Sequence, residues 1–205
     1  MQKIGLFGGT FDPIHNGHLH IARAFADELS LESVIFLPAG DPYHKTNPRT
    51  AAHHRLAMTE LAITHDERFA ASDCDMVREG ATYTFDTIQI FRQVFPQARL
   101  YWLLGMDSLL QLHTWSRWQQ LVKQIDIAVA VREGAHLNQA ARELHGWIGQ
   151  ALQEGSLHLL QAPPHTVSST DIREKARRGE DISQLVAPAV ADYIALHHLY
   201  SGTST

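Results

Sequence analysis

Apolar residues along the chain follow two alternating patterns. Short runs of consecutive apolar residues are typical of strands buried on both faces. Between these runs, apolar residues recur every three or four positions, which predicts amphipathic helices. The predicted strands span 4–7, 33–37, 69–74, 100–104, 125–131 and 157–161. The predicted helices span 17–29, 51–64, 83–95, 107–112, 115–123, 137–152, 170–178 and 189–197.

This alternation predicts an α/β fold, a Rossmann-like doubly wound parallel sheet with helices on both faces. The chain has 205 residues, and no repeat, low-complexity tract or linker divides them. We therefore expect a single domain over 1–205, with residues 201–205 frayed. Ligands of such sheets bind at the carboxyl ends of the strands. The segment that follows the first strand is the first place to look for chemistry.

Composition narrows the class of protein and its compartment. The formal net charge of -5 at pH 7 argues against general nucleic-acid binding, which usually uses a basic face. The single cysteine, Cys74, cannot form an intramolecular disulfide, and the 14 histidines show no Cys/His spacing of zinc-site type. No signal-peptide pattern and no apolar run near the ~20 residues of a membrane span is present. We expect a cytoplasmic protein with no nucleic-acid or membrane partner, while the oligomeric state stays open.

The stretch GGTFDPIHNGH follows the first predicted strand. Gly8 and Gly9 can take positive φ and let a ligand approach the backbone, and Asn16 is expected to cap the next helix. His15 and His18 are three positions apart, so they can face the same ligand at a helix amino end, where phosphate is favoured. The alternative interpretation is a tight strand–helix turn with two exposed histidines.

A second stretch, VSSTDIREKARRG, opens a late helix. Ser168 or Ser169 can cap this helix, and Ser169 and Thr170 offer hydroxyl and N–H groups to an anion. Arg173 adds a planar fork that suits phosphate oxygens. The alternative is a capped surface helix with a solvated basic face. Two separate helix amino ends equipped for phosphate favour the functional interpretation.

The two stretches together resemble the nucleotidylyltransferase superfamily, whose members share an HxGH motif and a late S/T-rich motif. The segments DPYHK, ATYTFDT, LLGMDSLLQLHTW and LVAPAVADYIALHHLY are similar to those of the bacterial nicotinate-mononucleotide adenylyltransferases. The resemblance implies adenylyl transfer from ATP to nicotinate mononucleotide, with Mg²⁺ accompanying ATP and no protein metal ligands. One segment departs from the pattern: many relatives have two prolines before the His-Lys pair, where this chain has Pro42-Tyr43-His44-Lys45.

The resemblance implies three groups of site residues. The catalytic residues would be His18, His15, Lys45 and Arg173. The ATP-binding residues would be Gly8, Gly9, Thr10, Phe11, His15, His18, Lys45, Gly105, Asp107, Ser169, Thr170 and Arg173. The mononucleotide would be bound by Tyr83, Thr84 and Trp115, with the Trp115 ring stacked on the pyridine and the Thr84 N–H facing the carboxylate.

Alternatives stay open at this point. Trp115 could be a core residue, Lys45 a solvated loop lysine, and Asp107 either a ribose ligand or a helix cap. The same chemistry could serve nicotinamide mononucleotide, phosphopantetheine or a cytidylyl acceptor. Two other classes are a non-catalytic nucleotide sensor and a Rossmann oxidoreductase. The oxidoreductase is disfavoured because GGTFDP lacks the G-x-G-x-x-G spacing of dinucleotide-binding loops.

Overall fold

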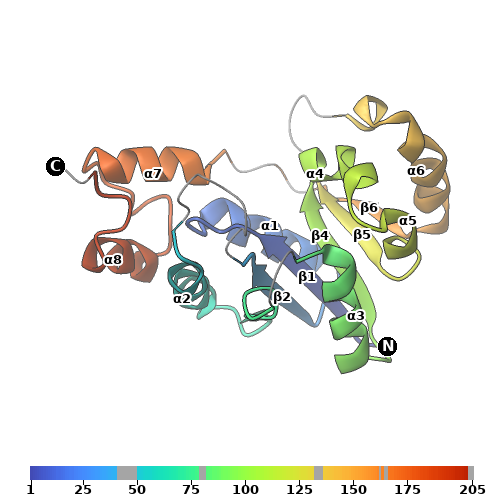
Figure 1. Ribbon diagram of the computed structural model, residues 1–205, viewed down its shortest axis with the longest axis horizontal. Helices are drawn as coiled ribbons and strands as arrows, with labels where there is room; N and C mark the ends of the chain where they lie inside the picture. The colour runs from blue at the N-terminus through green and yellow to red at the C-terminus, as the bar shows by residue number, and fades with distance from the viewer. Residues whose placement is uncertain (41–49, 79–81, 132–135, 162, 164–165, 203–205) are drawn as a thin grey trace.

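Six parallel strands form one sheet in the order β3-β2-β1-β4-β5-β6 in a computed structural model of the protein (Figure 1). The structure describes residues 1–40, 50–78, 82–131, 136–161, 163 and 166–202. The strands are β1 (Lys3–Gly9), β2 (Ser33–Pro38), β3 (Phe69–Ala71), β4 (Arg99–Gly105), β5 (Asp126–Ala130) and β6 (Leu157–Leu159). The strand order reverses between β1 and β4, and such a switch point is where doubly wound sheets bind ligands.

Helices cover both faces of this sheet, which confirms the predicted architecture. The helices are α1 (Asn16–Leu29), α2 (Ala52–Ile63), α3 (Thr84–Val94), α4 (Met106–Leu110), α5 (Trp118–Leu121), α6 (Arg142–Glu154), α7 (Ser169–Arg177) and α8 (Pro188–Leu196). Two 3₁₀ turns, η1 (Leu112–Thr114) and η2 (Leu137–Gln139), complete the described elements. Side chains of α1, α2, α7 and α8 share one apolar core, and those of α3, α4, α5 and α6 share the other. Alternate residues of the strands supply the two cores, as the pleat requires.

Several predicted elements have other bounds in the structure than expected. The strand predicted over 69–74 ends at Ala71, because the chain turns where the Met76 N–H donates to the Asp73 carbonyl at 2.7 Å. Arg117 takes a left-handed φ of 55°, so the helix predicted over 115–123 begins only after it. The helix predicted over 137–152 is divided into η2 and α6, because Ala141 is extended with ψ of 147°.

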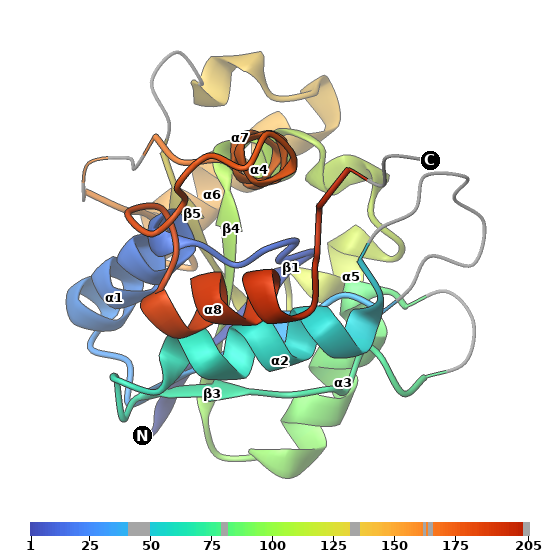
Figure 2. The same ribbon diagram turned by 90° about the vertical axis from the view of Figure 1, so that its left-hand side faces the viewer.

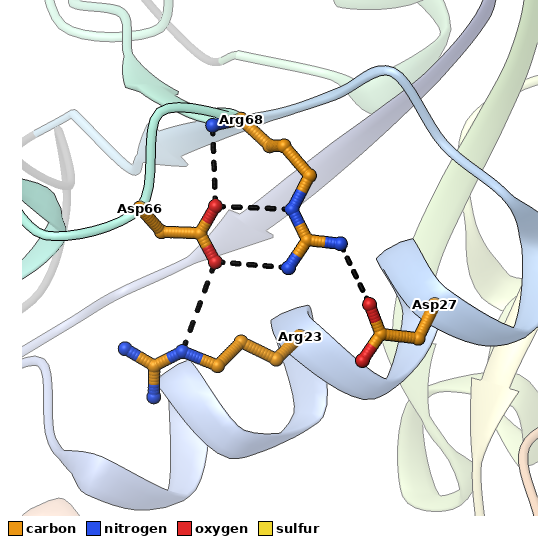
Figure 3. A network of polar contacts seen from close by, with 4 residues as sticks. All are labelled: Arg23, Asp27, Asp66 and Arg68. Atoms are coloured by element: carbon orange, nitrogen blue, oxygen red, sulfur yellow. Dashed lines mark hydrogen bonds and ion pairs between the residues drawn. The ribbon is translucent and has the colours of Figure 1, made fainter.

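An ion-pair network joins α1 to the start of β3 (Figure 3). Arg68 contacts both Asp66 oxygens at 3.0 Å and reaches Asp27 of α1 at 2.6 Å. Arg23 lies 3.8 Å from Asp66. Hydrogen bonding by Arg68 lowers the pKa of the Asp66 carboxyl, so the pair stays ionised at neutral pH. The network fixes α1 against the sheet at the edge remote from the strand carboxyl ends.

Helix α8 lies alongside α2 (Figure 2), and histidines gather where they meet. The Nδ1 atom of His54 lies 2.9 Å from the Tyr193 hydroxyl. The His54 ring centroid is 4.1 Å from that of His53 and 5.1 Å from that of His197. Burial, together with the neighbouring His53 and His197, lowers the pKa of His54. The folded state therefore binds a proton at His54 less readily than the unfolded state does.

This lowered pKa predicts acid sensitivity. The free energy of unfolding therefore decreases as the pH falls below about 6.5, the ordinary pKa of histidine, and continues to decrease until the pH reaches the lower pKa that His54 has in the folded state. We expect the Tm of the wild type to fall more between pH 7.5 and 5.5 than that of His54→Asn, which keeps a polar atom near Nδ1 but does not titrate. His65→Asn, at an exposed histidine, is the control and should follow the wild type. Parallel losses in all three proteins would contradict the assignment.

Candidate active site

A cavity of about 290 Å³ opens at the carboxyl ends of β1 and β4, at the switch point of the sheet. Six of the residues expected in the site line it: Gly8, Gly9, Thr10, Thr84, Gly105 and Trp115. They come from the end of β1, the end of β4, the start of α3 and the turn after η1. A larger cavity, of about 770 Å³, lies between α5 and α6 at the amino ends of β4 and β5 and contains none of the expected site residues.

Close packing explains the glycines of the first motif. A Cβ on Gly8 would lie 2.8 Å from the Trp102 ring, and one on Gly9 would lie 2.7 Å from the Phe11 ring. Trp102 also lines the cavity, so a side chain on Gly8 would push into the wall of the site. The expectation of positive φ at Gly8 and Gly9 is wrong, because both belong to β1. Phe11 takes the left-handed conformation instead, with φ of 49°.

The buried Phe11 ring supports the two histidines. His15 and His18 have ring centroids 3.7 Å apart and nearly parallel planes, and the Phe11 ring meets His18 edge-on at 5.0 Å. His15 is buried and His18 is half-buried. Like the two histidines, Phe11 does not line the cavity, and its ring contacts His18 instead. The His18 ring therefore contacts both His15 and Phe11.

The backbone at the start of α1 sets the tautomer of His18. The prediction that Asn16 caps α1 is wrong: His15 is the N-cap, and its N–H donates to His18 Nδ1 at 3.2 Å. An accepting Nδ1 leaves the proton of a neutral imidazole on Nε2, which can then donate. Asn16 is instead the first helical residue, and its side chain donates to the Gln184 carbonyl at 3.1 Å.

The late motif lies against the early one. Ser168 caps α7, and its Oγ accepts from the Asp171 N–H at 3.1 Å. Ser169 Oγ donates to the Pro13 carbonyl at 3.0 Å, and Arg173 Nη1 donates to the Asp12 carbonyl at 2.7 Å. The amino ends of α1 and α7 are therefore joined through the turn that separates β1 from α1. Arg173 Nη2 lies 3.3 Å from the Thr170 hydroxyl, which keeps these two expected phosphate ligands together.

Eight of the expected residues that the structure describes do not line the cavity, namely Phe11, His15, His18, Tyr83, Asp107, Ser169, Thr170 and Arg173. Tyr83 is the N-cap of α3 and is 47% exposed, whereas Thr84 is the first residue of that helix and does line the cavity. Asp107 is exposed in the first turn of α4, whose N-cap is Gly105, so the alternative in which Asp107 caps that helix is wrong. Ser108, its neighbour, lines the cavity. Lys45 lies outside the described residues.

Sequence reasoning missed Asp75, which lines the cavity beside Thr84. Its Oδ1 accepts from the Thr87 hydroxyl at 2.6 Å and lies 2.5 Å from Arg78 Nη2. No motif marks this residue, since a carboxylate in a short turn is common on any surface. The Thr87 contact ties the turn to α3, and so fixes the cavity wall next to Thr84.

A fully buried arginine was also missed. Arg55 of α2 donates from Nη1 to the Thr10 carbonyl at 2.8 Å and from Nε to the Thr50 carbonyl at 2.8 Å. The hydrogen bond to Thr10 ties the β1–α1 turn to α2. No sequence signal marks this role, because arginine is rarely found fully buried.

Across the parts of the chain that the structure describes, two features commonly sought are not found. No cluster of three or more His, Cys, Asp or Glu side chains could hold a metal ion. No described helix is both long and apolar enough to cross a membrane.

Comparison with known proteins gives the family. The family described as cytidylyltransferase-like matches residues 6–175, which contain both motifs, and the chain belongs to this family. A protein of Neisseria meningitidis serogroup B is 62% identical over 98% of this chain and 99% of its own length, and one of Bordetella petrii is 42% identical over 98% and 100%. Both are named "Probable nicotinate-nucleotide adenylyltransferase". These relatives place the chain in the nicotinate-nucleotide adenylyltransferase branch of the family.

The solved structures agree on the fold. A Plasmodium falciparum nicotinic acid mononucleotide adenylyltransferase complexed with NaAD superimposes with a TM-score of 0.78, at 19% identity, over 98% of each chain. The same enzyme complexed with APC gives a TM-score of 0.75. At this identity the likeness concerns the fold, and the fold class predicted from the alternation of strands and helices is confirmed.

Proposed function

We propose that the protein transfers the adenylyl group of ATP to nicotinate mononucleotide, forming nicotinate adenine dinucleotide and pyrophosphate. One observation carries the proposal: the amino end of α7 is bonded to the β1–α1 turn, and Thr10 of that turn lines a cavity together with Trp115 and Thr84. Helix amino ends favour phosphate, and the aromatic wall suits a pyridine ring. The naming of the full-length relatives supports the same reaction.

In the proposed reaction the 5′-phosphate of the mononucleotide attacks the α-phosphorus of ATP in line. A new P–O bond forms as the bond to the leaving pyrophosphate breaks. No protein nucleophile is required, because the attacking phosphate oxygen is already ionised. Catalysis then comes from alignment and from stabilising the charge that develops on the phosphoryl oxygens.

His18 is proposed as the donor to the α-phosphate, since its Nε2 carries the proton when Nδ1 accepts from the backbone. His15 would hold the His18 ring through their stacked contact and add a second imidazole towards the phosphates. Ser169, Thr170 and Arg173 would bind the triphosphate and then the pyrophosphate, with Lys45 as a further cation. Arg173 keeps Nη2 on the Thr170 side while Nη1 holds the Asp12 carbonyl.

The remaining roles follow from the cavity. Backbone groups of Gly8, Gly9 and Thr10 would line the nucleotide cleft at the end of β1, where the absence of a Cβ atom at the two glycines allows close approach. Gly105 would border the ribose. The N–H of Thr84, at the amino end of α3, would face the nicotinate carboxylate, because the helix dipole is positive there.

Mg²⁺ is proposed to accompany ATP and to reduce the repulsion between the attacking and accepting phosphates. The carboxylate on the cavity wall, Asp75, is engaged by Arg78 and Thr87. We therefore propose that substrate phosphates and water supply most of the magnesium ligands, as is common for this ion.

A panel of acceptors tests the proposed function. Nicotinate mononucleotide, nicotinamide mononucleotide and phosphopantetheine are each offered with ATP and, separately, with CTP, and pyrophosphate release is measured. We expect the highest kcat/KM with ATP and nicotinate mononucleotide. Faster turnover of another pair would replace the substrate assignment. ATP binding without pyrophosphate release from any pair would favour a nucleotide sensor.

Replacing Trp115 by alanine tests the pyridine pocket. Loss of an aromatic stacking surface costs about 1–3 kcal/mol per ring in comparable base-stacking sites. We expect the KM for nicotinate mononucleotide to rise about tenfold or more while the KM for ATP changes little. Trp118→Ala is the matched control, because Trp118 packs against Trp147 with centroids 6.4 Å apart and does not line the cavity. Equal losses for both substrates would contradict ring stacking at Trp115.

A further inference from the structure

Asp12 joins three distant parts of the chain. Its side chain is buried, with 6% exposure. Oδ1 accepts from the Tyr200 hydroxyl at 2.7 Å, and Oδ2 accepts from the Thr50 N–H at 3.3 Å. The Asp12 carbonyl accepts from Arg173 at 2.7 Å. We call these four residues, Asp12, Thr50, Arg173 and Tyr200, the Asp12 junction.

The chain after α8 adopts uncommon backbone conformations to reach this junction. His198 has φ of 50° and Tyr200 has φ of 61°, both in the left-handed region that non-glycine residues seldom occupy. Such conformations cost energy and persist only where the surroundings require them. At Tyr200 the compensation is a hydrogen bond to a buried carboxylate, which is stronger than one between neutral groups.

Tyr200 remains a hydrogen-bond donor over the working pH range. Burial and the adjacent Asp12 carboxylate both raise the pKa of its phenol. A buried carboxylate that lost this donor would be left with an unmet hydrogen-bonding site. The Asp12 turn would then be free to shift, and the Arg173 guanidinium that its carbonyl holds would shift with it.

We propose that Tyr200 is a positioning residue for the triphosphate side of the reaction. Through Asp12 it sets Arg173 and the turn that leads to His15 and His18 in one arrangement. No member of the Asp12 junction lines the cavity that holds Thr84 and Trp115. Arg173 of the junction is the residue proposed to bind the triphosphate, so the effect falls on ATP and on turnover and leaves the contacts of Thr84 and Trp115 unchanged. The inference rests on the proposed function, since it assigns the junction to one of its two substrates.

Tyr200→Phe in the full chain removes only the hydroxyl. We expect kcat to fall about tenfold, the KM for ATP to rise about threefold or more, and the KM for nicotinate mononucleotide to stay within twofold. Tyr193→Phe is the matched control. It also removes a phenol hydrogen bond, of 2.9 Å to His54, from the same end of the chain. Its Tm should fall comparably, with its kinetic constants unchanged.

Titration with ATP alone separates this inference from the proposed function. Tyr200→Phe should bind ATP about threefold or more weakly than Tyr193→Phe, whichever acceptor the protein uses. Asp12→Asn, which keeps one acceptor oxygen for Tyr200, is a second variant if Tyr200→Phe fails to fold. It should also weaken ATP binding. The inference is overturned if the tested variant loses Tm but keeps the wild-type kcat and ATP affinity. It is also overturned if the mononucleotide constant changes as much as the ATP constant.

Discussion

Replacing His18 by alanine is expected to lower kcat by about 10²–10³-fold and to leave the fold intact. That range is the usual cost of removing one donor that stabilises charge in the transition state. The fold should survive because His18 is half-buried at the start of α1, beside a core supplied by other residues. Steady-state pyrophosphate release with both substrates saturating measures the effect, and thermal unfolding checks the fold.

Two companion variants sharpen this test. His18→Gln places an amide N–H near the position of Nε2, so it should recover part of the lost rate. His20→Ala changes the next histidine of the same helix, whose Nε2 lies 2.9 Å from the Pro163 carbonyl, and should retain turnover near the wild-type rate. Near wild-type turnover of His18→Ala would remove His18 from the mechanism.

Arg55→Met is expected to produce the largest loss of stability, about 3–5 kcal/mol. Arg55 is fully buried, and the change would leave the Thr10 and Thr50 carbonyls without the donors that now reach them at 2.8 Å. Each buried polar group left unsatisfied costs about 1–3 kcal/mol. Urea unfolding monitored by circular dichroism gives the difference, provided that the slope of the transition stays constant.

Arg23→Met provides the comparison for Arg55→Met. The Arg23 side chain is 47% exposed, and its Nε lies as far as 3.8 Å from Asp66 Oδ2. Exposed ion pairs of this kind contribute about 0–1 kcal/mol to stability. A free energy of unfolding for Arg55→Met equal to that of Arg23→Met would show that the β1–α1 turn does not depend on the buried guanidinium.

Local patterns were sufficient to predict the fold and the strand ends at the cavity, whereas Thr84 and Trp115 were expected from the family resemblance. Runs of apolar residues predicted the six strands, and their parallel pairing placed Gly8 and Gly105 at adjoining strand ends. Boundaries were less predictable. The left-handed φ of Arg117 breaks a helix that has a regular apolar period. The cap at His15 is defined by a contact with His18, not by residue preference.

Long-range polar contacts could not be predicted from one sequence. Arg55 and Tyr200 are joined to Thr10 and Asp12 of the β1–α1 turn across large sequence separations, and no local pattern relates them. No sequence motif marks Asp75, because its contact with Thr87 depends on where α3 packs. For Tyr83 and Asp107 the sequence position was misleading. Each is adjacent to a residue that lines the cavity, yet neither lines the cavity itself.

The contact between Asp12 and Tyr200 spans 188 positions of sequence and has a consequence for biosynthesis. The sheet order lets β1, β2 and β3 pair while the second half of the chain is still being translated. The turn between β1 and α1, however, receives partners from residues 169–200 in addition to Thr50 and Arg55. A nascent chain therefore carries its histidine pair long before that turn is fully bonded, and the proposed phosphate site is complete only once residue 200 has left the ribosome.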